Sequence, residues 1–226
     1  MNIWEPFDPI VYFMHIILGG LGIVGAIAAL SVIKGSKFHI WAGRIFVFAA
    51  FVAALTAIIF SAVRFSGPAI ASSVMTFSAL GAALLALKPK TKLVFSGEII
   101  TTVLMGLALL WILFGTIMSL QTGRWLQPLI YLIFPLFMFI GDIRFLRKPN
   151  EQRVSAKLPR HYSRMGFAFA VAVHAPIVSF GNDLGIPPLV AFFGPLLIWP
   201  AIILFFNKRK PQIIITKNKA SEMVES

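Results

Sequence analysis

Three observations predict an all-α fold, a polytopic bundle of seven transmembrane helices: an apolar composition, seven long apolar runs, and a one-sided distribution of cations between those runs. The 226 residues are 58% hydrophobic and 12% charged, with a mean hydropathy of +0.88. Soluble domains are roughly 45–50% apolar and about 25% charged. The composition therefore indicates an integral membrane protein, and we expect a multi-pass protein of the cell inner membrane.

Each apolar run is close in length to the ~20 residues that a helix needs to cross a bilayer. A closed β-barrel is the other structure that can span a membrane, but these runs are continuously apolar and show no strand-like alternation. The predicted spans are residues 10–33, 40–63, 69–87, 99–120, 125–141, 162–180 and 187–206. They form one transmembrane domain, residues 1–206, followed by a basic tail, residues 207–226, that we expect to be disordered. The longest loop is predicted between Arg144 and Arg160.

The Lys and Arg residues predict the orientation of the bundle. All but two of the 20 lie at one set of span ends, and the exceptions are Arg64 and Arg124. Cytoplasmic loops collect Lys and Arg, so we expect the N-terminus outside and the C-terminus in the cytoplasm. The same asymmetry accounts for the net charge of +12. The expected partner is therefore the lipid bilayer, with anionic headgroups on the cytoplasmic side, and not nucleic acid; partner membrane subunits are left undefined.

Ionisable groups at membrane depth are costly and mark functional sites, which makes the four histidines the first candidates. His39 and His161 are predicted to begin the second and sixth helices on the cytoplasmic side. His15 lies in the second turn of the first helix, and His174 follows His161 by about 20 Å along the helix axis. The sequence thus predicts an inner pair, His39 and His161, and an outer pair, His15 and His174.

Two histidine pairs at two depths are what a membrane cytochrome with two b-type haems requires, because each iron takes an imidazole from opposite sides. Small residues, which let helices clasp a macrocycle, lie near these positions at Gly19, Gly20, Gly43, Gly166 and Ala170. One argument opposes two haems stacked in one groove: thirteen residues leave His161 and His174 about 140° apart around the helix. This mismatch is smaller if His161 precedes the first regular turn after Pro159. The alternative is that each histidine makes one interhelical hydrogen bond or contacts lipid phosphate. Gly19, Gly22 and Gly25 also suit close helix packing.

A second group of candidates is made of ion-pairing or proton-handling residues near the cytoplasmic face. Glu98 is predicted to open the fourth helix and Asp142 to close the fifth. We expect Glu98 to gain from the positive helix N-terminus, and Asp142 to pair with Arg144, Arg160 or Arg164. Arg44 is expected to reach the headgroups. A proton relay through the two carboxylates is possible in principle, but neither carboxylate is predicted near the bilayer midplane, where transporter sites lie.

Two stretches resemble an uncharacterised prokaryotic family of seven-helix membrane proteins, a domain of unknown function. The first is KGSKFHIWAGRIFV, which carries Lys-Gly-x-x-x-His-x-x-x-Gly-Arg after HIILGGLGIVGAIAAL. The second is GDIRFLRKP followed by LPRHYSRMGFAFAVAV. The resemblance singles out the following residues: His15, His39, Gly43, Arg44, Asp142, His161, Arg164 and Met165. It omits His174, where such proteins usually carry a small polar residue, and this departure counts against an outer haem. The family has no established activity, so the resemblance implies the architecture alone.

Two function classes follow. The sequence favours a non-catalytic membrane protein with a transport, assembly or scaffold role. The alternative is a membrane redox protein that is linked to b-type haem or to quinone and uses His39 and His161, with His15 and His174 as a second pair. With no cysteine in the chain, a thiolate zinc site and a Cys-ligated iron–sulfur cluster are excluded, and we expect no directly bound metal ion. The sequence leaves open whether the protein is an enzyme.

Overall fold

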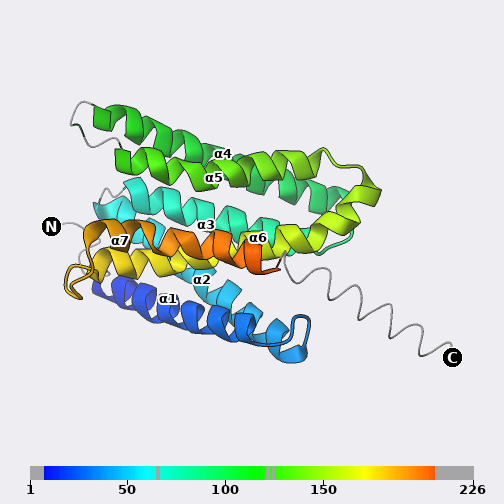
Figure 1. The fold of residues 1–226 in the computed structure, drawn as a ribbon, viewed down its shortest axis with the longest axis horizontal. Coiled ribbons are helices and arrows are strands. Elements are labelled where there is room, and N and C mark those ends of the chain that lie inside the picture. The colour runs from blue at the N-terminus through cyan, green and yellow to red at the C-terminus, as the bar shows by residue number, and fades with distance from the viewer. Residues whose placement is uncertain (1–7, 65–66, 121–122, 124–125, 207–226) are drawn as a thin grey trace.

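The computed structural model describes residues 8–64, 67–120, 123 and 126–206, and it confirms the all-α class (Figure 1). The helices are α1 Asp8–Ser31, α2 Lys37–Arg64, α3 Gly67–Ala86, α4 Lys92–Leu120, α5 Leu126–Leu146, α6 Asn150–Phe180 and α7 Pro188–Phe193. A 3-10 turn at Pro195–Leu197 follows α7, and residues 198–206 are again helical. With 188–206 taken as one helix, seven helices in the described residues are long and apolar enough to cross a membrane. The predicted tail, Glu5 and Arg124 lie outside the described residues.

Three helices extend beyond the predicted spans at the charged ends. Helix α4 begins at Lys92, α5 ends at Leu146, and α6 begins at Asn150. The expected long loop between Arg144 and Arg160 is therefore wrong, because only residues 147–149 separate α5 from α6. Hydropathy detects the bilayer-crossing part of a helix and misses its polar continuation. In α6 this continuation passes Pro159, which lies inside the helix.

The helices lie side by side along the long axis of the molecule, and α3 and α6 pack against each other in the middle (Figure 1). Helices α1 and α2 form one flank, and α4 and α5 form the other. The connections 32–36, 87–91 and 147–149 lie together at one end of the bundle. We call this the basic end, because Lys34, Lys88 and Arg147 lie on or beside these connections. Gly35, with φ of +84°, makes the first connection possible.

Small side chains fill the middle of the bundle. Ala49 in α2 and Ala79, Ala82 and Ala83 in α3 are fully buried. Helix α3 also bonds to α4 through the Ser78 hydroxyl, which donates to the Thr101 carbonyl at 2.6 Å. Large apolar side chains instead cover the outside of the bundle over most of its length. Small side chains between the helices and large apolar side chains on the outside suit a lipid environment, where close helix approach through small residues stabilises the bundle.

Glycines bring α1 and α2 into close contact, as predicted for two of the three positions. A Cβ added at Gly25 would lie 3.0 Å from the Phe46 backbone nitrogen, and one at Gly22 would lie 3.5 Å from that of Ala50. Gly19 does not take part, since a Cβ there would meet no atom within 4 Å. Helices α1 and α2 are thus in close contact toward the basic end, and there is open space beside Gly19.

Candidate functional site

Five charged side chains from α4, α5 and α6 are buried together near the basic end. Glu98 of α4 is 1% exposed and Asp142 of α5 is fully buried, while Arg153, Arg160 and Arg164 of α6 are 4 to 6% exposed. The three arginines follow one another at spacings of seven and four residues. These spacings place them on one face of a helix. We call this set of five residues the buried ion cluster.

Arg160 connects the two carboxylates. Its Nε donates to Asp142 Oδ1 at 3.1 Å, and its Nη1 donates to Glu98 Oε1 at 3.2 Å. Arg164 Nη2 reaches the same Asp142 oxygen at 2.8 Å and also donates to the Met138 carbonyl at 2.7 Å. On the other side, Arg153 forms an ion pair with Glu98. The cluster therefore ties three helices together through two carboxylates.

The aromatic ring of Phe145 lies between two of these arginines. The guanidinium carbons of Arg153 and Arg160 lie 4.3 and 4.1 Å from its centroid. A ring face attracts a cation more strongly when both are removed from water. Phe145 thus helps to hold two like charges near one another.

The buried ion cluster does not balance its charges. When ionised, its two carboxylates and three guanidinium groups sum to one positive charge. Asp142 Oδ2 and Arg153 Nη1 are buried without a hydrogen-bond partner. Arg160 Nη2 lies 2.9 Å from Asp142 Oδ1, but it too has no well-oriented hydrogen bond. Buried polar atoms that lack partners are costly, and such a surplus of positive charge favours the approach of an anion.

Asp142 pairs with Arg160 and Arg164, two of the three predicted partners, whereas Arg144 is exposed. Two predicted positions are wrong. Asp142 does not close its helix, since α5 continues to Leu146. Glu98 does not open a helix: α4 begins six residues earlier, and Glu98 is held by arginines and not by a helix N-terminus. Arg153 was not predicted, although its spacing from Arg160 was a usable signal.

Arg44 lies apart from the cluster. It is exposed on α2, so the structure does not join it with Asp142, Glu98 or Arg164. An exposed position near the basic end agrees with the expected contact with headgroups.

Three of the four histidines share one bonding pattern. Nδ1 of His15 lies 2.9 Å from the Ala53 carbonyl, Nδ1 of His39 lies 2.9 Å from the Ala29 carbonyl, and Nδ1 of His161 lies 3.0 Å from the Ala83 carbonyl. In each case the carbonyl belongs to a neighbouring helix. A histidine that binds a metal commonly donates its second ring N–H to a backbone carbonyl. This pattern leaves Nε2 as the nitrogen available to a ligand.

The inner histidines lie on α2 and α6, and His39 is close enough to His161 to interact with it electrostatically. About 10 Å from this level along either helix, the rings of Phe46 and Phe169 meet edge to face with centroids 6.5 Å apart. Helices α2 and α6 otherwise make few contacts with each other.

The outer pair is not brought together. His15 bonds to α2, whereas the ring of His174 packs against Tyr131 of α5 at 5.7 Å and Phe192 of α7 at 5.2 Å. The separation of about 140° between His161 and His174 around α6 explains this divergence. Because α6 is regular from Asn150 onward, Pro159 does not relieve it. Nε2 of His174 is buried without a partner.

Space and donor type decide what the inner histidines could hold. A Cβ added at Gly43, one turn after His39, would meet no atom within 4 Å. The space beside Gly166, in contrast, is occupied by the Ile202 side chain, and Ala170 is buried in the core. In the described part of the chain, no three His, Asp or Glu residues gather as a bare metal ion would require. Two imidazoles suit a haem iron, which takes its other ligands from the macrocycle, better than a naked ion.

Comparison of the chain with protein-family models, with curated proteins and with solved structures finds no match in any of the three. The resemblance of the His39 and His161 stretches to an uncharacterised membrane family therefore remains a prediction.

Proposed function

We propose that this protein is a multi-pass membrane protein that binds one b-type haem near the basic end of the bundle, where Nε2 of His39 and Nε2 of His161 would hold the iron. The observation that carries the proposal is the shared hydrogen bonding of these two imidazoles. Each is held through Nδ1 by a backbone carbonyl of a neighbouring helix, which leaves its Nε2 for a ligand. His39 and His161 are also close enough to interact electrostatically. A haem bound there would supply one-electron redox chemistry, which suits a role in membrane electron transfer.

The surrounding residues support this assignment. Gly43 lies on the His39 face of α2, four residues further on, where its missing side chain leaves room for a macrocycle. The Phe46–Phe169 pair supplies an apolar boundary on the midplane side. Burial and the hydrogen bonds to the ligating imidazoles are the means by which a protein tunes a haem potential. The outer histidines are not part of the proposal, because His174 is turned toward α5 and α7.

The proposal is tested by purifying the full chain from cells supplied with haem and recording oxidised and reduced visible spectra. We expect a Soret band, sharp α and β bands on reduction, and about one haem per chain. His39→Ala and His161→Ala should each abolish the bands, whereas His15→Ala should retain them. A colourless wild-type protein would overturn the proposal, as would equal loss of haem in the His15→Ala variant.

Two further variants separate ligation from folding. His39→Gly should regain a low-spin spectrum when imidazole is added, because the free base can replace the missing ligand. Gly43→Leu should lose haem while both histidines remain, since its side chain would occupy the open space. Gly115→Leu is the matched control: a Cβ at Gly115 also meets no atom within 4 Å, but this glycine is exposed on α4. Circular dichroism should show unchanged helix content in all three.

A transport, assembly or scaffold role is the second candidate, and the buried ion cluster is the observation that favours it. Glu98 and Asp142 are enclosed by arginines near one end of the bundle, away from the midplane. This arrangement supports a structural use of the carboxylates more than a proton relay. A colourless protein whose phenotype follows Asp142 or Glu98 would favour this candidate over the haem proposal.

A further inference from the structure

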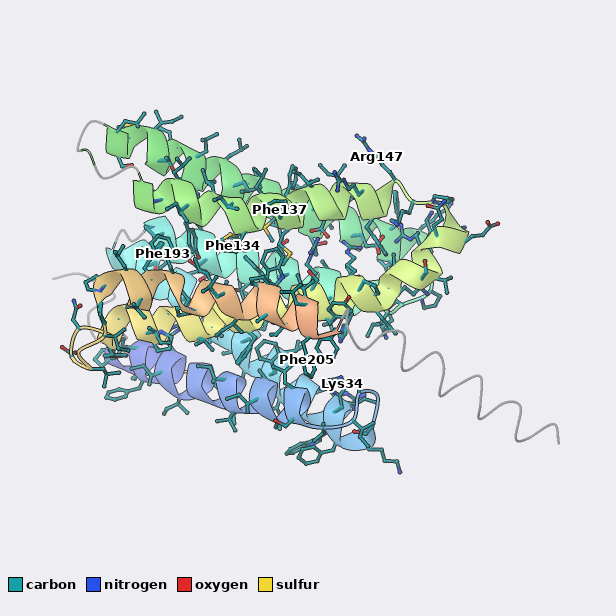
Figure 2. All side chains as sticks on the ribbon, in the orientation of Figure 1. Lys34, Phe134, Phe137, Arg147, Phe193 and Phe205 are labelled. Atoms are coloured by element: carbon teal, nitrogen blue, oxygen red, sulfur yellow. The ribbon has the colours of Figure 1, made fainter. Side chains whose placement is uncertain are left out.

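A pocket of about 310 Å³ opens beside the buried ion cluster, between the end of α5, the middle of α6 and the last helical segment of the chain. It lies on the opposite side of α6 from the α3 carbonyl that holds His161. The residues that line it include Gly141, Phe145, Lys148, Arg160, Arg164 and Ile203. Figure 2 shows side-chain nitrogen atoms gathered between α5 and α6 toward the end where Arg147 is labelled.

The pocket exists because α5 and α6 make few contacts with each other, although the chain connects them directly. Deeper in the bundle the gap is closed by Trp199, whose ring meets Phe134 of α5 at 5.6 Å and Phe167 of α6 at 6.1 Å. Trp199 is fixed in turn by its Nε1, which donates to the Ser163 carbonyl at 3.0 Å. The pocket is therefore a recess at the basic end, and Trp199 closes the gap deeper in the bundle, beyond the residues that line it.

The recess carries positive charge that the protein neutralises only in part. Arg160 and Arg164 line it and are at least nine-tenths buried. Both are ion-paired with Asp142, and Arg160 Nη2, 2.9 Å from Asp142 Oδ1, makes no well-oriented hydrogen bond. The buried ion cluster to which both belong has one positive charge in excess, and Lys148 adds another at the rim. Gly141 lets the Arg164 guanidinium approach, because a Cβ there would lie 3.1 Å from its Nη2.

The rest of the lining is mostly apolar, with Tyr162 and Ser163 as its hydroxyl side chains. Ile203 forms the wall from the last helical segment, and Ala156 and Pro159 form part of the α6 side. A group that fits this lining is anionic at one end and hydrocarbon at the other. Basic pockets between helices on the cytoplasmic side of membrane proteins bind the headgroups of anionic lipids.

We infer that this recess binds the phosphate group of an anionic phospholipid, with Arg160, Arg164 and Lys148 around the phosphate and an acyl chain along Ile203. The ligand is a phosphodiester with net negative charge, of the phosphatidylglycerol type. The site is separate from the proposed haem site, so that either assignment can fail without the other.

The test uses the full chain in phosphatidylcholine vesicles that contain a trace of spin-labelled phosphatidylglycerol or spin-labelled phosphatidylcholine. We expect the protein to immobilise the anionic label preferentially. Lys148→Gln should reduce this preference about five-fold, since one cation near the surface contributes about that much. Arg147→Gln removes the same charge from the adjacent residue, which is exposed and outside the lining, and should change the preference little. Ala156→Phe should fill the recess and remove the preference without altering charge.

Three results would overturn the inference. The first is an equal effect of Lys148→Gln and Arg147→Gln, which would mean surface charge alone. The second is an unchanged preference in Ala156→Phe. The third comes from adding inorganic phosphate to the wild type in pure phosphatidylcholine vesicles and measuring its thermal stability. A stabilisation as large as that from phosphatidylglycerol would mean that the recess binds a free anion and not a lipid.

Discussion

At the scale of single residues, the described part of the chain buries five charged side chains in one cluster and pairs them there. A lone buried ion is very costly, and removing one partner of a buried pair leaves the other uncompensated. Asp142 is the extreme case because one of its oxygens receives both Arg160 and Arg164. Its side chain therefore decides whether two guanidinium groups are tolerated next to Met138 and Phe145.

We predict that Asp142→Asn destabilises the protein by about 3–5 kcal/mol, because it leaves two buried cations without their shared carboxylate. Thermal and denaturant unfolding followed by circular dichroism would measure the loss. Glu151→Gln, which removes an exposed carboxylate from the first turn of α6, should stay within about 0.5 kcal/mol of wild type. Adding Arg164→Gln to Asp142→Asn should recover part of the stability. Equal stability of the Asp142 and Glu151 variants would contradict this account.

At the scale of helices, the sequence predicted where the bilayer is crossed better than where the helices end. Seven apolar runs matched seven helices, but α4 and α6 continue through Lys92, Arg153 and other polar residues that hydropathy treats as loop. The contact between Glu98 and Arg153 could not be predicted from the sequence, because the two residues are 55 positions apart in the chain and lie on different helices. His161 was predicted to begin its helix, but α6 starts eleven residues earlier, at Asn150. The ring neighbours of His174 depended on which helices flank α6.

The packing of α1 on α2 gives a prediction at this scale. Gly25→Leu should force the helices apart, because even a Cβ there lies 3.0 Å from the Phe46 backbone nitrogen and 3.2 Å from the Ala42 carbonyl oxygen. Overpacking of this kind costs about 1–3 kcal/mol, and the His39–Ala29 bond between the two helices should weaken with it. Unfolding of Gly25→Leu in detergent, compared with Gly115→Leu on the exposed face of α4, would measure the difference. Indistinguishable stabilities would mean that the two helices are not held at this glycine.

At the scale of the whole molecule, the charge asymmetry read from the sequence coincides with the shape of the fold. The connections that carry the lysines and arginines lie at one end of the bundle (Figure 1). The buried ion cluster and the inner histidines lie on the parts of their helices nearest that end. Architecture was predictable because composition and helix length depend on local sequence. The recess beside α5 was not, since it arises from sparse contact between two helices that are adjacent in the chain.

The orientation in the membrane can be measured directly because the chain contains no cysteine, so that any thiol introduced is the only one. We predict that the basic end faces the cytoplasm, since cations are retained on that side. Gln152→Cys places a thiol near the basic end, and Asn182→Cys places one at the opposite end; both positions are exposed, and neither change alters the charge. A membrane-impermeant maleimide should label Asn182→Cys in intact cells with a permeable outer layer, and Gln152→Cys only after the inner membrane is opened. The reverse pattern would place the haem and lipid sites on the outer face, and it would remove the cytoplasmic leaflet as the source of the anionic headgroup.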